Sequence, residues 1–203
     1  MQGWRKRMED SHIADLTLGN DPKLNLFGVF DGHGGREVAV YVKKHFTEEL
    51  IKNKSYKANN YKQSLIENFL KMDEIMVLTD GKLELKIEAK KSKEDDEKQS
   101  KNDKNSQTEA FKTYLDKTKD NADVAMFTGC TAVVCLVDGN KVYCSNAGDS
   151  RAVLCKKGVA IALSIDHKPD LDTEKNRIYK ADGWVSDGRV KGKFKIEFFL
   201  KEI

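Results

Sequence analysis

The feature of this sequence that most constrains its fold is an apolar run ending in a glycine-rich turn. Leu26–Phe30 is apolar throughout, which is typical of a buried strand. Asp31–Gly35 follows as Asp-Gly-His-Gly-Gly, whose glycines allow the backbone to turn sharply where the strand ends. A carboxylate at this strand tip, Asp31, can ligate a hard divalent cation, and the imidazole of His33 can move a proton. The alternative interpretation is a hairpin turn with incidental polar residues.

A second acidic group lies upstream of this turn. Glu9 and Asp10 are adjacent, and Arg5, a candidate phosphate ligand, precedes them. If this segment and the strand before Asp31 pair as antiparallel neighbours, the two carboxylates approach Asp31. An oxygen-rich site of this kind suits Mg²⁺ or Mn²⁺ better than zinc, which prefers Cys and His ligands. The alternative is a solvated, charged edge strand.

A further carboxylate, Asp149, falls at a junction between predicted strands. Residues 131–137 are apolar and β-branched, residues 138–139 are an Asp-Gly turn pair, and residues 141–145 resume a strand-like alternation. Asp149 follows this hairpin in the sequence Gly-Asp-Ser-Arg. Taken alone, that sequence indicates a turn and nothing more.

Together these segments resemble the metal-dependent serine/threonine protein phosphatases of the PPM (type 2C) family. The resemblance covers most of residues 1–192 except the middle, and its motifs occur in the family's order. They are Met1–Arg5, Met8–Asp10, Phe27–Gly35, Gly129–Ala132, Ala147–Arg151, Asp166–Pro169 and the stretch from Glu174 to Val190.

The resemblance implies an α+β fold, in which two packed antiparallel β-sheets are flanked by α-helices and carry a metal centre at one end. It implies two Mg²⁺ or Mn²⁺ ions, with Asp31 bridging them. The Gly32 carbonyl and Glu9 would bind one ion, and Asp10 would orient its waters. Asp149 would belong to a weaker third metal position.

The resemblance also implies an activity, the hydrolysis of phosphoserine and phosphothreonine in phosphoprotein substrates by a metal-activated water. Arg5 would hold the substrate phosphate in a bidentate grip, and His33 would protonate the leaving oxygen. No catalytic cysteine is expected. We also expect a monomer.

Residues 193–203 depart from the family pattern, although their alternating apolar residues are compatible with a strand. The family's first strand and its last aspartate motifs are absent, so we expect a domain over 1–192 that is incomplete at both ends. A truncated product or a gene-model error would explain this, and the chain itself is then expected to be inactive. The alternative function is an inactive family member that acts as a regulatory or phosphoprotein-binding fragment. A calcineurin-like phosphoesterase is set aside, because the sequence lacks a Gly-Asn-His motif.

Apolar stripes at helical spacing predict helices after Gly35, to about residue 50, and over 61–76. Residues 80–107 are dominated by charged and polar side chains, so we predict a disordered or frayed-helix insertion there. Helix is expected to resume around 110–115. Further predicted elements are a strand pair over 151–155 and 159–164, a helix over 172–181 capped by Gly183, and a turn at 187–188; His167 is expected to bond nearby backbone in a loop.

Charge and composition exclude several classes of partner. The 36 basic and 33 acidic residues nearly cancel, giving a net charge of +3, and this balance does not indicate a nucleic acid or an anionic membrane as a partner. No apolar run is long enough to span a bilayer, and the charged residues 1–10 do not form a secretory signal. We therefore expect an intracellular protein, cytoplasmic or nuclear, with peripheral membrane association left open. Its four cysteines, without Cys-x-x-Cys spacing, are expected to be buried free thiols.

Overall fold

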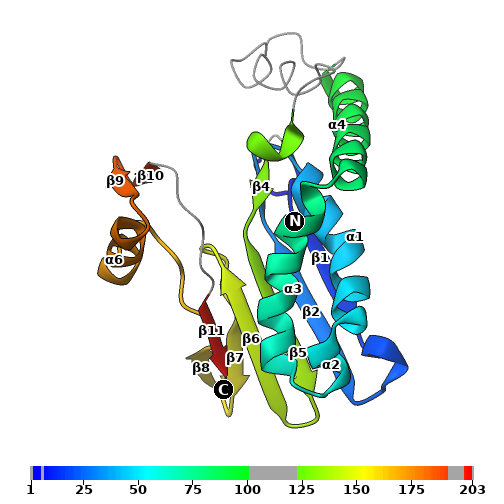
Figure 1. The fold of residues 1–203 in the computed structure, drawn as a ribbon, viewed down its shortest axis with the longest axis vertical. Coiled ribbons are helices and arrows are strands. Elements are labelled where there is room, and N and C mark those ends of the chain that lie inside the picture. The colour runs from blue at the N-terminus through cyan, green and yellow to red at the C-terminus, as the bar shows by residue number, and fades with distance from the viewer. Residues whose placement is uncertain (1, 6, 101–122, 192–198, 203) are drawn as a thin grey trace. The chain divides into compact units, whose positions relative to one another are not determined.

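The structure is a computed structural model that describes residues 2–5, 7–100, 123–191 and 199–202. Its contacts divide the chain into two compact units. The first unit contains residues 1–13 and 29–130, and the second contains residues 14–28 and 131–203. Figure 1 shows the elements of both, and each unit is described by itself below.

The N-terminal part of the chain contains two strands. These are β1 (Ser11–Asp15) and β2 (Leu24–Phe30), joined through the 3-10 turn η1 (Leu18–Asn20). The strand predicted to end before Asp31 is therefore confirmed. It is buried on one face only, because Leu24, Leu26 and Phe30 are buried whereas Phe27 and Val29 are exposed.

The predicted hairpin that follows residue 130 is also confirmed. It consists of β5 (Ala132–Asp138) and β6 (Lys141–Ala147), paired antiparallel. Asp138 pairs with Lys141, so the two loop residues are 139 and 140 rather than 138 and 139. Gly139 supplies the positive φ of +57° that a two-residue hairpin loop requires.

One further strand lies in the tail that departs from the family pattern. This is β11 (Phe199–Glu202), which pairs antiparallel with β6, and residues 193–198 before it lie outside the described residues. The strands described so far form a sheet in the order β1-β2-β5-β6-β11. Each strand pair with a described register is antiparallel, as expected for this α+β fold.

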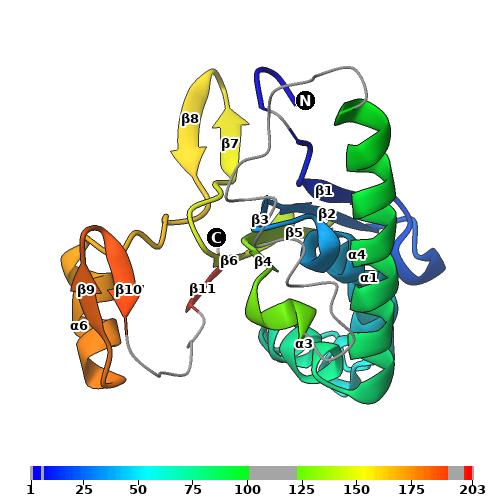
Figure 2. The same cartoon turned by 90° about the horizontal axis from the view of Figure 1, so that it is seen from above.

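Within its described residues the first unit contains four α-helices: α1 (Glu37–Lys52), α2 (Lys54–Lys57), α3 (Tyr61–Met76) and α4 (Thr79–Ser100). The predicted apolar stripes of α1 and α3 are buried. Phe46 of α1 joins the core, since its ring centroid lies 5.6 Å from Phe69 of α3 and 5.9 Å from Phe30 at the end of β2. In Figure 2, α1, α3 and α4 lie side by side, and each pair of them is in contact.

Residues 80–100, predicted to be disordered or a frayed helix, belong to the helix α4, so the disordered alternative is wrong for them. This helix buries Gly81, Leu85, Ala89 and Ser92, which recur every three or four residues and so form one stripe. Charged residues also bind it to α1: Glu84 accepts a hydrogen bond from Lys44 Nζ at 2.7 Å and contacts His45 Nε2 at 2.9 Å. Residues 101–107 and the helix expected around 110–115 lie outside the described residues.

The last part of the second unit follows the predicted pattern. The hairpin β7 (Val153–Lys156) and β8 (Val159–Ala162) precedes α6 (Asp172–Lys180), and the hairpin β9 (Trp184–Ser186) and β10 (Arg189–Lys191) follows it. The cap of α6 differs from the prediction. Asp182 takes the left-handed conformation at φ +59°, and the N–H of Gly183 donates to the Ile178 carbonyl at 2.9 Å in a Schellman arrangement.

The exposure of the four free cysteines differs from the expected buried thiols. Cys144 is buried, Cys130 and Cys135 are half-buried, and Cys155 is exposed on β7. In the part of the chain that is described, no helix is both long and apolar enough to cross a membrane.

Candidate active site

The end of β2 presents Asp31 and His33 to solvent. Phe30 anchors the strand end in the core, with 0% of its surface exposed. The next three residues alternate in exposure: Asp31 and His33 are exposed, whereas Gly32 between them is buried. The strand tip therefore displays one carboxylate and one imidazole, as the sequence predicts.

Gly32 lies directly against the backbone of Glu9. A Cβ atom added at Gly32 would lie well inside 3.0 Å of the Glu9 carbonyl oxygen and 3.2 Å from the Glu9 carbonyl carbon. Glycine is required here because any side chain would displace this neighbouring backbone. The predicted approach of the two acidic segments is thus found at the level of the backbone. The Glu9 side chain is half-buried and that of Asp10 is exposed, immediately before β1.

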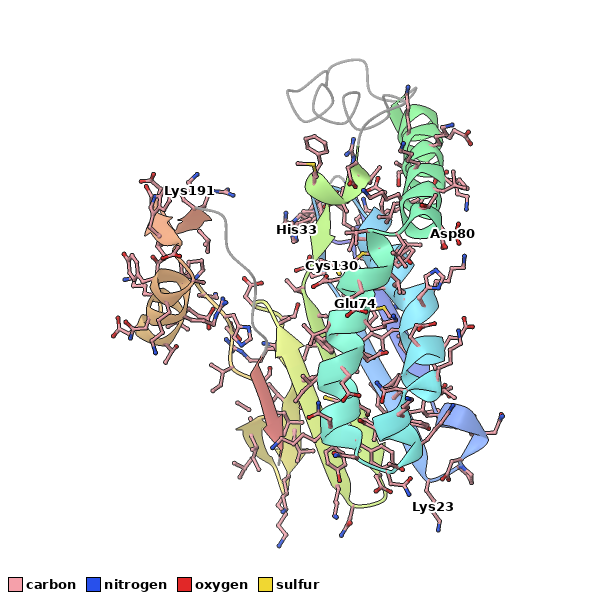
Figure 3. The ribbon with its side chains drawn as sticks, in the orientation of Figure 1. Lys23, His33, Glu74, Asp80, Cys130 and Lys191 are labelled. Carbon is pink, nitrogen blue, oxygen red and sulfur yellow. The ribbon has the colours of Figure 1, made fainter. Side chains whose placement is uncertain are left out.

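A short two-stranded sheet positions His33. In it β3 (Gly32–His33) pairs antiparallel with β4 (Gly129–Cys130), so that His33 lies opposite Gly129. A Cβ atom at Gly129 would approach Nε2 of His33 to 2.7 Å, so the absence of a side chain at residue 129 leaves room for the imidazole. Figure 3 labels His33 and Cys130 in this region.

Cys130 lies opposite Gly32, and its thiol is held in the protonated form. Burial, together with the negative charges of Asp73 and Asp31, raises the pKa of this thiol to about 12. Since the thiolate is the reactive form, this shift lowers the reactivity expected of Cys130 at neutral pH.

The remaining loop glycines connect the site to α1. Gly34 adopts φ +71°, and a Cβ atom there would collide with the Phe127 carbonyl oxygen, beside the 3-10 turn η2 (Val124–Met126). Arg36, the N-cap residue of α1, bonds to α4, with its Nη2 2.7 Å from Asp95 Oδ2 and 3.5 Å from Glu88 Oε1. The glycine loop therefore lies between η2 and the ion pairs of Arg36 with Glu88 and Asp95, which we call the Arg36 clamp.

Arg5 lies in an exposed N-terminal turn. Its N–H donates to the Gln2 carbonyl at 3.2 Å, and Gln2 Nε2 donates to the Arg5 carbonyl at 2.9 Å. Gly3, between them, has φ +58°. The side chain of Arg5 is exposed and thus accessible to an anion.

Asp149 belongs to the second unit, in the loop after β6. Gly148 adopts φ +111° and packs on Thr131, whose Oγ1 lies 2.6 Å from Ser150 Oγ. His167 holds this loop with two hydrogen bonds. Its ring Nδ1 accepts from the Gly148 backbone N–H at 3.3 Å, and its backbone N–H donates to the Gly148 carbonyl at 2.9 Å. The prediction of a loop histidine bonded to nearby backbone is confirmed. Asp149 itself is exposed.

The structure also reveals contributors that sequence reasoning missed. Gly129 makes room for His33, and the Phe127 carbonyl restricts residue 34 to glycine. Both precede or begin the Gly129–Ala132 motif, which the sequence singled out without a role. In the sequence, the one sign of a special backbone position in this motif was a glycine, Gly129, two residues before the β-branched Thr131.

A metal ion would need several of these carboxylates at once. Among the residues that the structure describes, no three His, Cys, Asp or Glu side chains form a group that could hold a metal. Asp149 and Asp31 lie in different units, so the described geometry of each stands alone. The donors are oxygen atoms, which suits Mg²⁺ or Mn²⁺ chemically, but the described positions do not form a complete site.

Comparison with known proteins identifies the family. A family model described as "Protein phosphatase 2C" matches residues 1–84 and 76–196. The chain belongs to the protein phosphatase 2C family. Proteins of this family are metal-dependent protein phosphatases.

Curated relatives of the same family align over nearly the whole chain. "Probable protein phosphatase 2C 4" of Paramecium tetraurelia is 44% identical over 203 residues, which are 100% of this chain and 57% of that protein. "Probable protein phosphatase 2C 21" of Arabidopsis thaliana is 39% identical over 199 residues, 95% of this chain and 55% of that protein. This chain therefore spans a little over half the length of these relatives.

Solved structures show the same fold. A Caenorhabditis elegans sex determining protein has a TM-score of 0.60 and 19% identity, covering 94% of this chain and 39% of that one. A serine-threonine phosphatase 2C from Toxoplasma gondii has a TM-score of 0.51 and 21% identity, covering 89% of this chain and 52% of that one.

Proposed function

We propose that this protein hydrolyses phosphoserine and phosphothreonine in phosphoprotein substrates. The observation that carries the proposal is the backbone contact between Glu9 and Gly32, beside the exposed Asp31 and His33. This contact brings the backbone of the Glu9 segment against the strand end that carries Asp31, and so supports the proposal.

We further propose that the metal is Mg²⁺ or Mn²⁺. The residues that would hold it are Asp31, the Gly32 carbonyl, Glu9, Asp10 and, at a weaker position, Asp149. All offer oxygen atoms, the ligand type that these hard cations prefer. When bound, a pair of such ions lowers the pKa of a water and neutralises phosphoryl charge. Because the described carboxylates do not converge on one point, we derive no geometry for the ions.

Two residues of this chain have roles that do not depend on metal geometry. The exposed guanidinium of Arg5 would bind two phosphoryl oxygens at once, which a lysine cannot reproduce. The imidazole of His33, held over Gly129, would donate a proton to the leaving serine or threonine oxygen. Arg5 would thus hold the phosphate of the substrate, and His33 would protonate its leaving oxygen.

We propose that the protein works as a monomer in a reducing, intracellular compartment. Its four cysteines are free thiols, which is the usual state inside cells. The near balance of 36 basic and 33 acidic residues supports a protein substrate rather than a nucleic acid.

The test is hydrolysis of a phosphothreonine peptide by the protein expressed from its complete reading frame. We expect turnover with Mg²⁺ or Mn²⁺ and none in excess EDTA. Asp31→Asn should abolish turnover, because the ligand loses its charge. Asp187→Asn is the matched control, since Asp187 lies in the exposed β9–β10 turn, where Asn also tolerates φ +54°. Full activity of Asp31→Asn, or turnover in EDTA, would overturn the proposal.

A further inference from the structure

The central hairpin of the second unit carries two cysteines directly opposite each other. Cys135 of β5 is the register partner of Cys144 of β6. Asp138 and Lys141 close the two-residue loop and therefore form a hydrogen-bonded pair. Pair types alternate along an antiparallel ladder, so the Cys135–Cys144 pair, three positions further, is not hydrogen-bonded.

This pair type brings the two thiols close together. Opposite Cα atoms in a pair without backbone hydrogen bonds lie about 4.5 Å apart, with their side chains nearer than in the other pair type. Disulfides usually join Cα atoms separated by about 4.4–6.8 Å. The hairpin therefore already has a spacing that a disulfide can bridge without moving the strands.

The two thiols differ in their surroundings. Cys144 has 2% of its surface exposed and packs with Val133 and Leu163, whereas Cys135 is half-buried at the edge of that cluster. The Cys144 thiol hydrogen-bonds to Cys135, which lowers the pKa of Cys135 and raises that of Cys144. Cys135 is thus the more accessible thiol of the pair, and Cys144 is its shielded neighbour.

The other two cysteines lack such a partner across their strands. Cys130 lies opposite Gly32, and Cys155 lies opposite Ala160. They serve as internal controls, because one is half-buried and the other exposed.

We propose that Cys135 and Cys144 form a redox-active dithiol that a peroxide oxidises to a disulfide across β5 and β6. The Cys135 thiolate attacks the peroxide, the O–O bond breaks, and Cys135 becomes a sulfenic acid while the departing oxygen takes up a proton to leave as water. The Cys144 sulfur then attacks the Cys135 sulfur. The S–O bond breaks, and the hydroxyl leaves as a second water with the Cys144 proton. Two thiols are oxidised by two electrons, and one hydrogen peroxide is reduced to two waters. This inference is independent of the proposed phosphatase activity.

The test uses the whole chain with Cys130→Ala and Cys155→Ala, so that only the pair remains. After treatment with hydrogen peroxide, the protein is denatured, alkylated and digested with trypsin. Trypsin cuts after Lys141, between the two cysteines, and leaves Cys135 and Cys144 on different peptides. We expect loss of both alkylation sites and a linked pair of peptides, within one molecule, that a reductant separates.

Two further samples keep the test decisive. Cys144→Ala removes the resolving thiol, so that Cys135 should accumulate as a sulfenic acid trapped by dimedone. The unmodified four-cysteine chain guards against misfolding of the variants, and the same link should form in it, with Cys130 and Cys155 still alkylated. Two alkylatable thiols after peroxide treatment, oxidation of Cys135 to sulfinic acid without a link, or a link only between molecules would overturn the proposal.

Discussion

Replacement of Gly32 by alanine tests the contact on which the candidate site rests. The added methyl group would meet three backbone atoms: the Glu9 carbonyl oxygen inside 3.0 Å, the Gly35 carbonyl oxygen at 3.1 Å and the Glu9 carbonyl carbon at 3.2 Å. None of these atoms can rotate away as a flexible side chain could, so the loop and the Glu9 segment must separate.

The magnitude follows from two opposing effects. Overpacking a tight site costs about 1–3 kcal/mol. Alanine also restricts the unfolded chain, which offsets the cost by about 0.4–1 kcal/mol. The expected net loss is about 1–2 kcal/mol, and since 1 kcal/mol shifts Tm by about 2–4 °C in a protein of this size, Tm should fall by about 2–8 °C.

The assay is thermal and urea unfolding of the wild type, Gly32→Ala and a matched control. Gly158→Ala is that control, because Gly158 has φ +79° but nothing within 4 Å of an added Cβ atom. It should show only the backbone cost of a left-handed alanine, about 1–2 kcal/mol. Gly32→Ala has no such backbone cost, so a loss reports the contacts of residue 32 with the Glu9 and Gly35 backbone. An unfolding midpoint equal to or above that of the wild type would refute the reasoning.

Three other outcomes are expected. Burial opposes ionisation of Glu84, but hydrogen bonds from Lys44 and His45 outweigh it and lower the pKa of Glu84; its stabilisation is therefore present above the ordinary carboxyl pKa and lost as the pH falls through the folded-state pKa. Urea midpoints from about pH 7 to about pH 3 should thus fall more for the wild type than for Glu84→Gln, and parallel curves would contradict this. Asn53→Ala removes the side-chain cap of α2 and should destabilise by about 1 kcal/mol, whereas Asn53→Ser keeps an oxygen acceptor for the cap and should lose less in the same urea assay. His33→Ala should slow phosphopeptide hydrolysis more than aryl phosphate hydrolysis, whose leaving group needs little protonation, and equal losses would argue for a structural histidine.

The sequence predicted the elements whose side chains follow a simple period. The β5–β6 hairpin and the stripes of α1 and α3 have apolar residues at regular spacing, and in the structure the hairpin forms and the stripes are buried as predicted. The approach of Glu9 to Gly32 could also be predicted, because neighbouring antiparallel strands bring their ends together.

The helix α4 could not be predicted in the same way. Its buried stripe contains only one large apolar residue, Leu85, beside Gly81, Ala89 and Ser92. Small residues allow a helix to pack closely while adding almost nothing to an apolar pattern. Its ionic contacts with α1, such as Arg36 with Asp95, join residues far apart in the sequence, and no local pattern shows them.

The Arg36 clamp has an evolutionary consequence. Arg36 directly follows the glycine loop, and its two carboxylate partners, Glu88 and Asp95, belong to the charged helix. In relatives where the segment equivalent to α4 is shorter or diverges in sequence, an arginine at this position would have lost its partners. Position 36 should therefore vary together with positions 88 and 95, while Asp31 and His33 beside it stay the same.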